Sequence, residues 1–394
     1  MKSLAFRGRD DWAVVESFLP AGWEEQAREL GALRRARGFE DPSSLLRTLM
    51  IHLADGCSLR ETAARAKKGG VAAVSDVALL KRLRTSGEWF RWMAAGVMKD
   101  FVPKQPTEVF GAERCVRLVD ATVVLEPGKT GSTWRIHYSV GLPTLECTEV
   151  HVTTQRVGET LKRFAVEPGD VLLGDRGYAH PGGIGHVIDS GGDVLVRLNL
   201  SSVPLLNEAG EAFALLEKLR SLQGTALGDY DVFIRSNGIL HPGRVCAIRK
   251  SRDAARKARL NVRRAARANG HEVRDDTVEA AGYIFVFTTL PRGQFSPTRV
   301  LETYRGRWQV ELAFKRLKSL IGLGHLRKRD QDGAKAWIHG KLLVAFLIEA
   351  MITAGESFFP WGYPIREEVA EKQVNLERDV VHATTAEPGR EPSS

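Results

Sequence analysis

The sequence CVRLVDATVVL, residues 115–125, marks the point where the character of the chain changes. It is rich in residues that favour β-strands, and two similar runs follow, TWRIHYSV at 133–140 and LECTEVHVT at 145–153. Glycine or proline bounds the runs. We therefore expect three antiparallel strands joined by short connections.

The segments after these strands alternate between helix-like and strand-like patterns. Residues 158–164 predict a short helix, and VLLGDRGYA at 171–179 predicts an apolar strand that stops at a glycine turn. A further helix-like segment leads to DVLVRLNL at 193–200. This order predicts an α/β fold with a mixed sheet and helices, not an all-β sandwich.

Residues 1–105 show the apolar spacing of helices and no strand pattern. Ser58 and Glu61 form a capping-box pattern ahead of one helix, and Ser75 or Asp76 suits the start of the next. This pair of helices loosely resembles a helix-turn-helix, but such pairs are also common in bundles that bind nothing. DNA contact and a purely structural role both stay open. The predicted helices cover Ser43–Leu53, Leu59–Ala66 and Val77–Leu83.

Residues 200–290 read as a separate unit placed within the α/β region. Short strands such as YDVFIR, RVCAIRK and GYIFVFTTL flank a strongly basic stretch. Residues 250–267 contain eight Lys or Arg and a single acid, Asp253. A solvated surface arm explains such a stretch, and contact with a nucleic-acid backbone is the functional alternative.

The composition indicates a basic globular protein. The 394 residues include 57 Lys or Arg against 48 Asp or Glu, which gives a net charge of +9 and suggests an anionic partner, nucleic acid ahead of a membrane surface. The four cysteines show no paired short spacing, which argues against zinc ribbons and disulfide frameworks. No apolar signal core is present at the start, and the longest apolar run, Leu342–Ile352, is interrupted by Glu349. We expect a cytoplasmic protein without a membrane span.

Three carboxylates stand out from their surroundings. Asp120 sits inside an apolar strand, where an unpaired charge would cost several kcal/mol, and Asp175 ends another apolar strand before a glycine turn. Glu311 lies on a later predicted helix. Any one of them suits a cap or a buried ion pair. Together, three oxygen donors at one sheet edge suit Mg²⁺ or Mn²⁺.

Glu311 belongs to a polar stripe with Tyr304, Arg307 and Lys318. At about 100° per residue, these four positions fall within roughly 60° of one another on a helix. Apolar residues gather on the opposite side, so we expect one helix that buries its back and presents the stripe. A solvated helix face with an incidental ion pair explains the same spacing.

The sequence YRGRWQVELAFKRLK, residues 304–318, resembles the Tyr, Arg, Glu, Lys signature of the acid-triad (DDE) transposases of bacterial insertion sequences, in the insertion sequence 4 family. VRLVDATVV and LLGDRGYAH are similar to the contexts of that family's two aspartates. The resemblance covers roughly residues 40–350. It implies that Asp120, Asp175 and Glu311 form the catalytic triad and bind two Mg²⁺ or Mn²⁺ ions.

The resemblance also implies roles for residues around the triad. Tyr304, Arg307 and Lys318 are expected to hold DNA phosphates near the cut end. Trp308 either packs beside DNA or against the insertion, and Arg176 either acts at the active site or forms an ion pair. Relatives stack a tryptophan of the insertion on a flipped base; this insertion has none, and Tyr283 is the nearest counterpart, although a strand aromatic is more often core.

The implied function is metal-dependent cleavage of transposon ends in double-stranded DNA and strand transfer into target DNA, by a homodimer. A catalytically silent DNA-binding descendant and a structure-selective nuclease on the same fold are the alternatives. The fold class expected is α/β: a ribonuclease-H-like mixed sheet interrupted by a β-rich insertion and preceded by an all-helical N-terminal domain. The domains expected are a helical DNA-binding domain (1–108), the first part of the core (109–199), the insertion with its basic arm (200–290), the second part of the core (291–360) and a partly disordered tail (361–394).

Overall fold

The computed structural model describes residues 11–35, 38–101, 114–125, 132–142, 146–307, 322, 326 and 330–356. The predicted site residues Trp308, Glu311 and Lys318, and the whole of the predicted tail, lie outside the described residues. The chain divides into two compact units. One consists of residues 1–18 and 347–394, and the other of residues 19–346.

Short helices make up the described part of the chain before the sheet, as the sequence predicted. The side chains of Ser58 and Ser75 each accept a hydrogen bond from a backbone N–H three residues on, so both predicted caps begin their helices. Among the described residues 11–35 and 38–101, no strand is present. The helices are α1 (Trp12–Glu16), α2 (Trp23–Glu29), α3 (Pro42–Leu53), α4 (Leu59–Lys68), α5 (Asp76–Thr85) and α6 (Gly87–Phe101).

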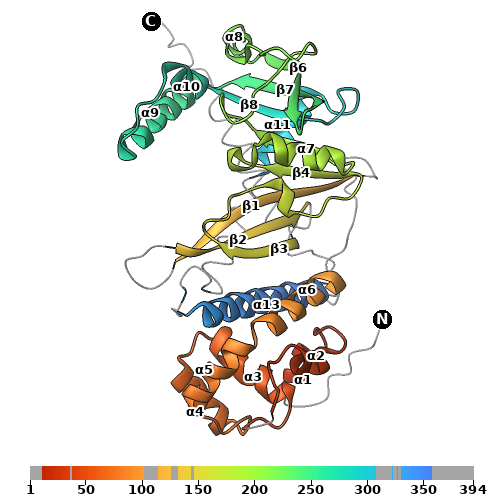
Figure 1. Ribbon diagram of the computed structural model, residues 1–394, viewed down its shortest axis with the longest axis vertical. Helices are drawn as coiled ribbons and strands as arrows, with labels where there is room; N and C mark the ends of the chain where they lie inside the picture. The colour runs from red at the N-terminus through yellow and green to blue at the C-terminus, as the bar shows by residue number, and fades with distance from the viewer. Residues whose placement is uncertain are drawn as a thin grey trace, which may run out of the picture. The chain divides into compact units, whose positions relative to one another are not determined.

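One eight-stranded mixed sheet follows, in the order β3-β2-β1-β4-β5-β8-β7-β6 (Figure 1). The three strands predicted first form an antiparallel set, and β4 and β5 run parallel to β1. The α/β fold with a mixed sheet is therefore confirmed. The strands are β1 (Cys115–Leu125), β2 (Ser132–Gly141), β3 (Cys147–Thr154), β4 (Asp170–Gly174), β5 (Asp193–Arg197), β6 (Leu227–Ser236), β7 (Ile239–Arg249) and β8 (Tyr283–Thr288).

The strands expected in the insertion are present, but they do not form a sheet of their own. Strand β8 pairs with β5 through Val196 and Phe287, and β7 and β6 extend the same sheet beyond it. This pairing could not be predicted, because strand composition identifies a strand and not its neighbour in the sheet. The helices of this region are α8 (Leu215–Arg220), α9 (Arg252–Ala268) and α10 (Asp275–Ala280).

The short helix predicted at residues 158–164 is reduced to a single 3₁₀ turn, Leu161–Arg163. Thr160 caps it with its side chain, but Phe164 is already extended, so no α-helical turn follows. The next predicted helix is present as α7 (Pro181–Asp189), which packs on β5 and β6. Buried residues of α7 and the strands share one hydrophobic core.

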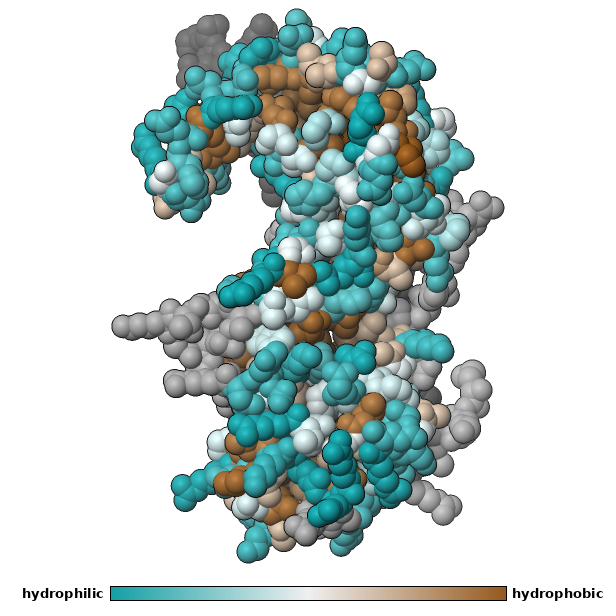
Figure 2. Space-filling view, in the orientation of Figure 1, coloured by the Kyte–Doolittle hydropathy of each residue, from teal (hydrophilic) through white to brown (hydrophobic). Residues whose placement is uncertain are grey.

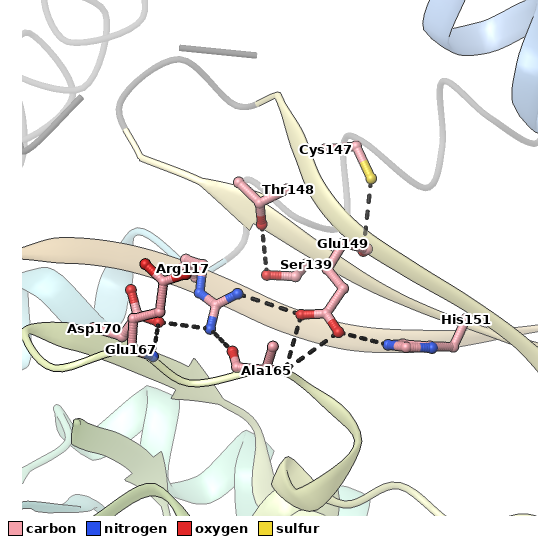
Figure 3. A network of polar contacts seen from close by, with 9 residues as sticks. All are labelled: Arg117, Ser139, Cys147, Thr148, Glu149, His151, Ala165, Glu167 and Asp170. Carbon is pink, nitrogen blue, oxygen red and sulfur yellow. Dashed lines mark hydrogen bonds and ion pairs between the residues drawn. The ribbon is translucent and has the colours of Figure 1, made fainter. Parts of the chain in front are cut away.

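A buried ion-pair network ties β1, β3 and β4 together (Figure 3). The Arg117 guanidinium on β1 lies 3.3 Å from Glu149 Oε2 on β3 and 2.9 Å from Asp170 Oδ2 on β4. His151 Nε2 lies 2.7 Å from Glu149 Oε1, and the backbone N–H of Ala165 donates to the same carboxylate. Removing one member would leave buried charge unpaired, so the network fixes the strands' alignment.

Helix α13 (Gln331–Glu356) is long and apolar enough to cross a membrane, judged by length and composition alone. However, 72% of its apolar window is buried inside the structure. Its His339 Nδ1 lies 3.1 Å from the Gly87 carbonyl, and an added Cβ at Gly340 would meet Leu53 at 2.6 Å. The first half of α13 therefore packs closely on the predicted N-terminal helices, as a core helix does.

Candidate active site

Two neighbouring parallel strands carry Asp120 and Asp175 to the same level of the sheet. Asp120 lies within β1, and Asp175 directly follows Gly174, the last residue of β4. The strands are in register at Leu118 and Leu173, so each acid is two positions past that pair. Because adjacent strands lie about 4.8 Å apart, the two carboxylates are neighbours. The structure thus brings the first two predicted acids together.

The Asp120 carboxylate is held in an unfavourable environment for a charge. Burial, together with the negative charge of Asp175, raises its pKa to about 6. The Ala121 N–H donates to Asp120 Oδ1 at 2.8 Å, and Arg307 Nη1 lies 3.7 Å from Oδ2; both favour the charged form but do not cancel the burial. The charged form of Asp120 therefore stays disfavoured in this structure.

Glu159 is a further carboxylate at this position, and the sequence reasoning missed it. Burial raises the pKa of Glu159, and the negative charge of Asp175 raises it further. The charge of Glu159 in turn raises the pKa of Asp120. An added Cβ at Gly177 would meet Glu159 Oε2 at 2.2 Å and Asp175 Oδ1 at 3.1 Å, so both carboxylates face this glycine. Arg135 lies 3.8 Å from Glu159 Oε1. Glu159 lies in the predicted helix 158–164, just before the 3₁₀ turn that the structure has there, and no local signal marks it as a site residue.

Tyr178 is the second residue that the sequence reasoning missed. Its side chain is fully buried, and its hydroxyl has no hydrogen-bond partner among the described residues. Burial raises its pKa, and the negative charges of Asp120, Glu159 and Asp175 raise it further. A buried hydroxyl without a partner costs about 1–3 kcal/mol. A bound water or hydrated ion at the carboxylates offers that partner.

The predicted polar stripe does not lie on one uninterrupted helix. Helix α11 (Pro297–Arg305) contains Tyr304 and ends before Gly306, so Arg307 lies in the turn that follows. Glycine is a poor helix former, which favours the break there. Tyr304 is 8% exposed rather than presented to solvent, and burial raises its pKa. Arg307, by contrast, lies close to the acids, with its Nη1 3.7 Å from Asp120 Oδ2.

A group of cations borders the carboxylates. Arg176 follows Asp175 directly, and burial and Arg197 lower its pKa. Burial also lowers the pKa of Lys250 to about 8, with contributions from Arg197 and Arg176. Arg197 ends β5, and Lys250 directly follows β7. Because β4, β5 and β7 run in one direction, these three cations lie at the edge of the sheet that holds Asp175, an arrangement that suits phosphate.

Tyr283 does not belong to this site. It is the first residue of β8, is 4% exposed and packs in the hydrophobic core. The suggestion that it stacks on a flipped base is not supported, because a buried core ring presents no face to a base. The sequence indicated a core position, because Tyr283, Phe285 and Phe287 are aromatic residues at every second position of β8.

The donor set fits a hard divalent cation. Asp120, Asp175 and Glu159 offer carboxylate oxygens, the donors that Mg²⁺ prefers. Within the part of the chain that the structure describes, no three Asp, Glu, His or Cys side chains stand close enough to form a complete metal site. The third predicted ligand, Glu311, lies outside the described residues. Crowded, desolvated carboxylates with an unpartnered hydroxyl nevertheless form a site that a cation stabilises.

A mixed sheet with two adjacent acids, bordered by cations, suits an enzyme that acts on phosphate esters. The family of the transposase DDE domain matches residues 111–347. The chain belongs to this family, the DDE transposases of bacterial insertion sequences, and is a DNA transposase. Enzymes of this family depend on divalent metal ions for phosphoryl transfer on DNA.

Individual proteins show the same relationship. The InsL protein for insertion sequence element IS186A of Escherichia coli K12 is 35% identical over 359 residues, covering 89% of this chain and 96% of the relative. The transposase for insertion sequence element IS421 of Escherichia coli is 35% identical over 360 residues, with the same coverage. A solved piggyBac transposase synaptic complex with hairpin DNA matches 97% of this chain and 84% of the piggyBac chain, with a TM-score of 0.40 and 8% sequence identity. A likeness of this size supports no statement about fold or function.

Proposed function

We propose that this transposase cuts element ends and joins them to target DNA at an active site formed by Asp120, Asp175 and Glu311. The observation that carries the proposal is the pair of carboxylates on adjacent strands, with Arg307 3.7 Å from Asp120. Arg307 and Glu311 belong to one signature, four residues apart. The signature therefore contributes at least one residue, Arg307, to the surroundings of Asp120.

The cofactor proposed is a pair of Mg²⁺ or Mn²⁺ ions held by Asp120, Asp175 and Glu311. When bound, the ions supply Lewis-acid stabilisation of phosphate oxygens and a nucleophile active at neutral pH. The protein's part is to supply oxygen donors and exclude bulk water. Partial burial of Asp120 contributes to both tasks, since a desolvated carboxylate attracts a cation more strongly than a hydrated one.

Positively charged residues beside the acids are proposed to hold the DNA strand. Arg307 and Lys318 would bind phosphates near the cut end, where Arg offers a forked donor and Lys a point charge. Tyr304 offers a hydroxyl that has no partner among the described residues. Arg176 joins this group through its position beside Asp175. Trp308 is proposed to pack beside the bound DNA.

The domain roles follow from the same proposal. Residues 109–199 and 291–360 would form a ribonuclease-H-like core, because β1 and β4 carry both aspartates. Residues 200–290 form the insertion, whose strands extend the core sheet. Residues 1–108 would bind DNA, and 361–394 would form a tail. We expect a homodimer on paired element ends, acting in the bacterial cytoplasm.

The experiment that tests this function is a strand-transfer assay. The protein is incubated with Mg²⁺ and a labelled duplex that carries the inverted repeat flanking this reading frame, together with a plasmid target. A transposase yields cut ends and then covalently joined products. Cutting without joining would favour a structure-selective nuclease, and binding without cutting would favour a silent DNA-binding descendant. Asp175→Asn is the matched control, since it retains shape and removes a proposed metal ligand.

A further inference from the structure

The basic stretch at residues 250–267 is folded, from Arg252 on, as a single helix, α9, and most of its surface is solvent-exposed. Ser251 caps its start by accepting from the Ala254 N–H, and Ala255 is buried beneath it. Lys250 fixes the base: its backbone N–H and its side chain donate to the carbonyls of Gly282 and Ala281. The arm is thus an anchored helix.

The cations of α9 form a stripe. Arg252, Arg256, Arg263 and Arg267 fall within about 60° of one another at about 100° per residue. All four are exposed, and Figure 2 shows hydrophilic side chains over this helix at the upper left. At about 1.5 Å per residue, the stripe is roughly 22 Å long.

This pattern is unfavourable for an isolated helix. Arginines four residues apart repel one another, at a cost of about 0.2–0.5 kcal/mol for each pair. A solvated helix face usually mixes both signs, yet the only acid here is Asp253, which pairs with Arg256 at 3.1 Å. No described carboxylate pairs with Arg263 or Arg267. A polyanionic partner removes the repulsion.

The N-terminal end of α9 lies on the same side of the sheet as the acids of the candidate active site. Strands β4, β5 and β7 run in one direction, so Arg176 after β4, Arg197 at the end of β5 and Lys250 just after β7 lie at one edge of the sheet. Arg176 follows Asp175 directly. Cations therefore continue from the acids, through the ends of β5 and β7, to the first residue of the helix. A duplex with a phosphate at the acids meets positive charge along this path.

We propose that α9 binds the phosphate backbone of the duplex that is held at the active site, beyond the point of cutting. The inference rests on the proposed function and adds a binding surface to it. A stripe of roughly 22 Å passes about six phosphates of one strand, at about 3.4 Å of axis rise each. Arginine-phosphate contacts of this kind position DNA without reading its sequence.

The test uses the full chain, without divalent metal, and a labelled duplex carrying the inverted repeat. Arg263→Gln/Arg267→Gln removes two stripe cations, and glutamine preserves helix propensity. Lys218→Gln/Arg235→Gln, on exposed positions of α8 and β6, removes the same charge elsewhere in the insertion. Binding is measured by fluorescence anisotropy over a range of salt concentrations, with circular dichroism to check folding.

The inference predicts that the slope of log affinity against log salt falls by about 0.9 for each lost contact, thus by about 2 for the α9 variant. The control should match the parent. A duplex too short to reach α9 should bind the parent and the α9 variant equally.

Equal slopes for the parent and the α9 variant on the long duplex overturn the inference, as does an equal loss in the control. A defect confined to capture of a second, target duplex by a preformed end complex overturns the assignment to the cut duplex. The proposed function is judged separately: it fails if the parent protein neither binds nor cuts end DNA when Mg²⁺ is added.

Discussion

Replacing Asp120 with asparagine should stabilise the metal-free protein while abolishing DNA cutting. The charge of Asp120 is disfavoured by burial and by Asp175, so its pKa rises from 3.8 to about 6. Asparagine preserves the shape and the oxygen that accepts from the Ala121 N–H, but it carries no charge. The substitution therefore removes the electrostatic penalty and little else.

The size of the effect follows from the pKa shift. A shift of about two units corresponds to roughly 3 kcal/mol at about 1.4 kcal/mol per unit, an upper estimate for this partly solvated side chain. The pKa is raised in the folded state, so the folded protein binds more protons between pH 4 and pH 6. Stability from this group is present below about pH 4 and is lost as the pH rises through about 6.

The assay is urea denaturation of the parent and Asp120→Asn in EDTA, at about pH 4 and about pH 8. The variant should be more stable by up to about 3 kcal/mol at the higher pH and nearly equal at the lower. Added Mg²⁺ should stabilise the parent and not the variant, because binding to the folded state alone shifts the equilibrium. The reasoning is refuted if the variant is less stable at high pH, or if its gain is the same at both pH values.

Three further substitutions test other parts of the account. Tyr178→Phe should leave the free energy of unfolding unchanged or raise it, because the hydroxyl has no partner among the described residues. The same substitution should raise the Mg²⁺ concentration needed for half-maximal cutting about tenfold. Tyr230→Phe, at the far end of the sheet, is the control, and an unchanged Mg²⁺ requirement in Tyr178→Phe contradicts a role at the site. Lys318→Ala should lower the salt slope of end binding by about 0.9, and an unchanged slope in anisotropy titrations counts against phosphate contact. Gly243→Ala should destabilise by about 1–3 kcal/mol in urea denaturation, because its Cβ would meet the buried Phe287 ring at 2.3 Å; a neutral result means that the ring moves freely.

The sequence predicted the parts of the fold that depend on local pattern. The three antiparallel strands, β4, α7, β5 and the insertion strands all occupy the expected segments. Pairing between distant strands could not be read locally, so the joining of β8 to β5 was missed. The same limit applies to α11: helical spacing continues through Arg307, but the chain turns at Gly306.

The sequence motifs and the residues around them identified part of the candidate site. Asp120 and Asp175 were singled out because each stands as a charge in an apolar strand, and their proximity depends on the register of β1 and β4. Glu159 and Tyr178 join them only through the tertiary fold, since one lies in a connection and the other reads as an ordinary core aromatic. Local sequence marks a residue as unusual; it does not show which residues surround it.

The most direct test of the central claim is single-turnover cutting of end DNA in Mg²⁺ by the parent and by Glu311→Gln, with affinity for the same DNA measured in Ca²⁺. If Asp120, Asp175 and Glu311 form one metal site, the variant should bind the end as tightly as the parent and cut it at least about a thousandfold more slowly, since metal-assisted phosphoryl transfer depends on its ligands. A variant that binds normally and cuts at the parent's rate contradicts the assignment of Glu311 and the triad built on it.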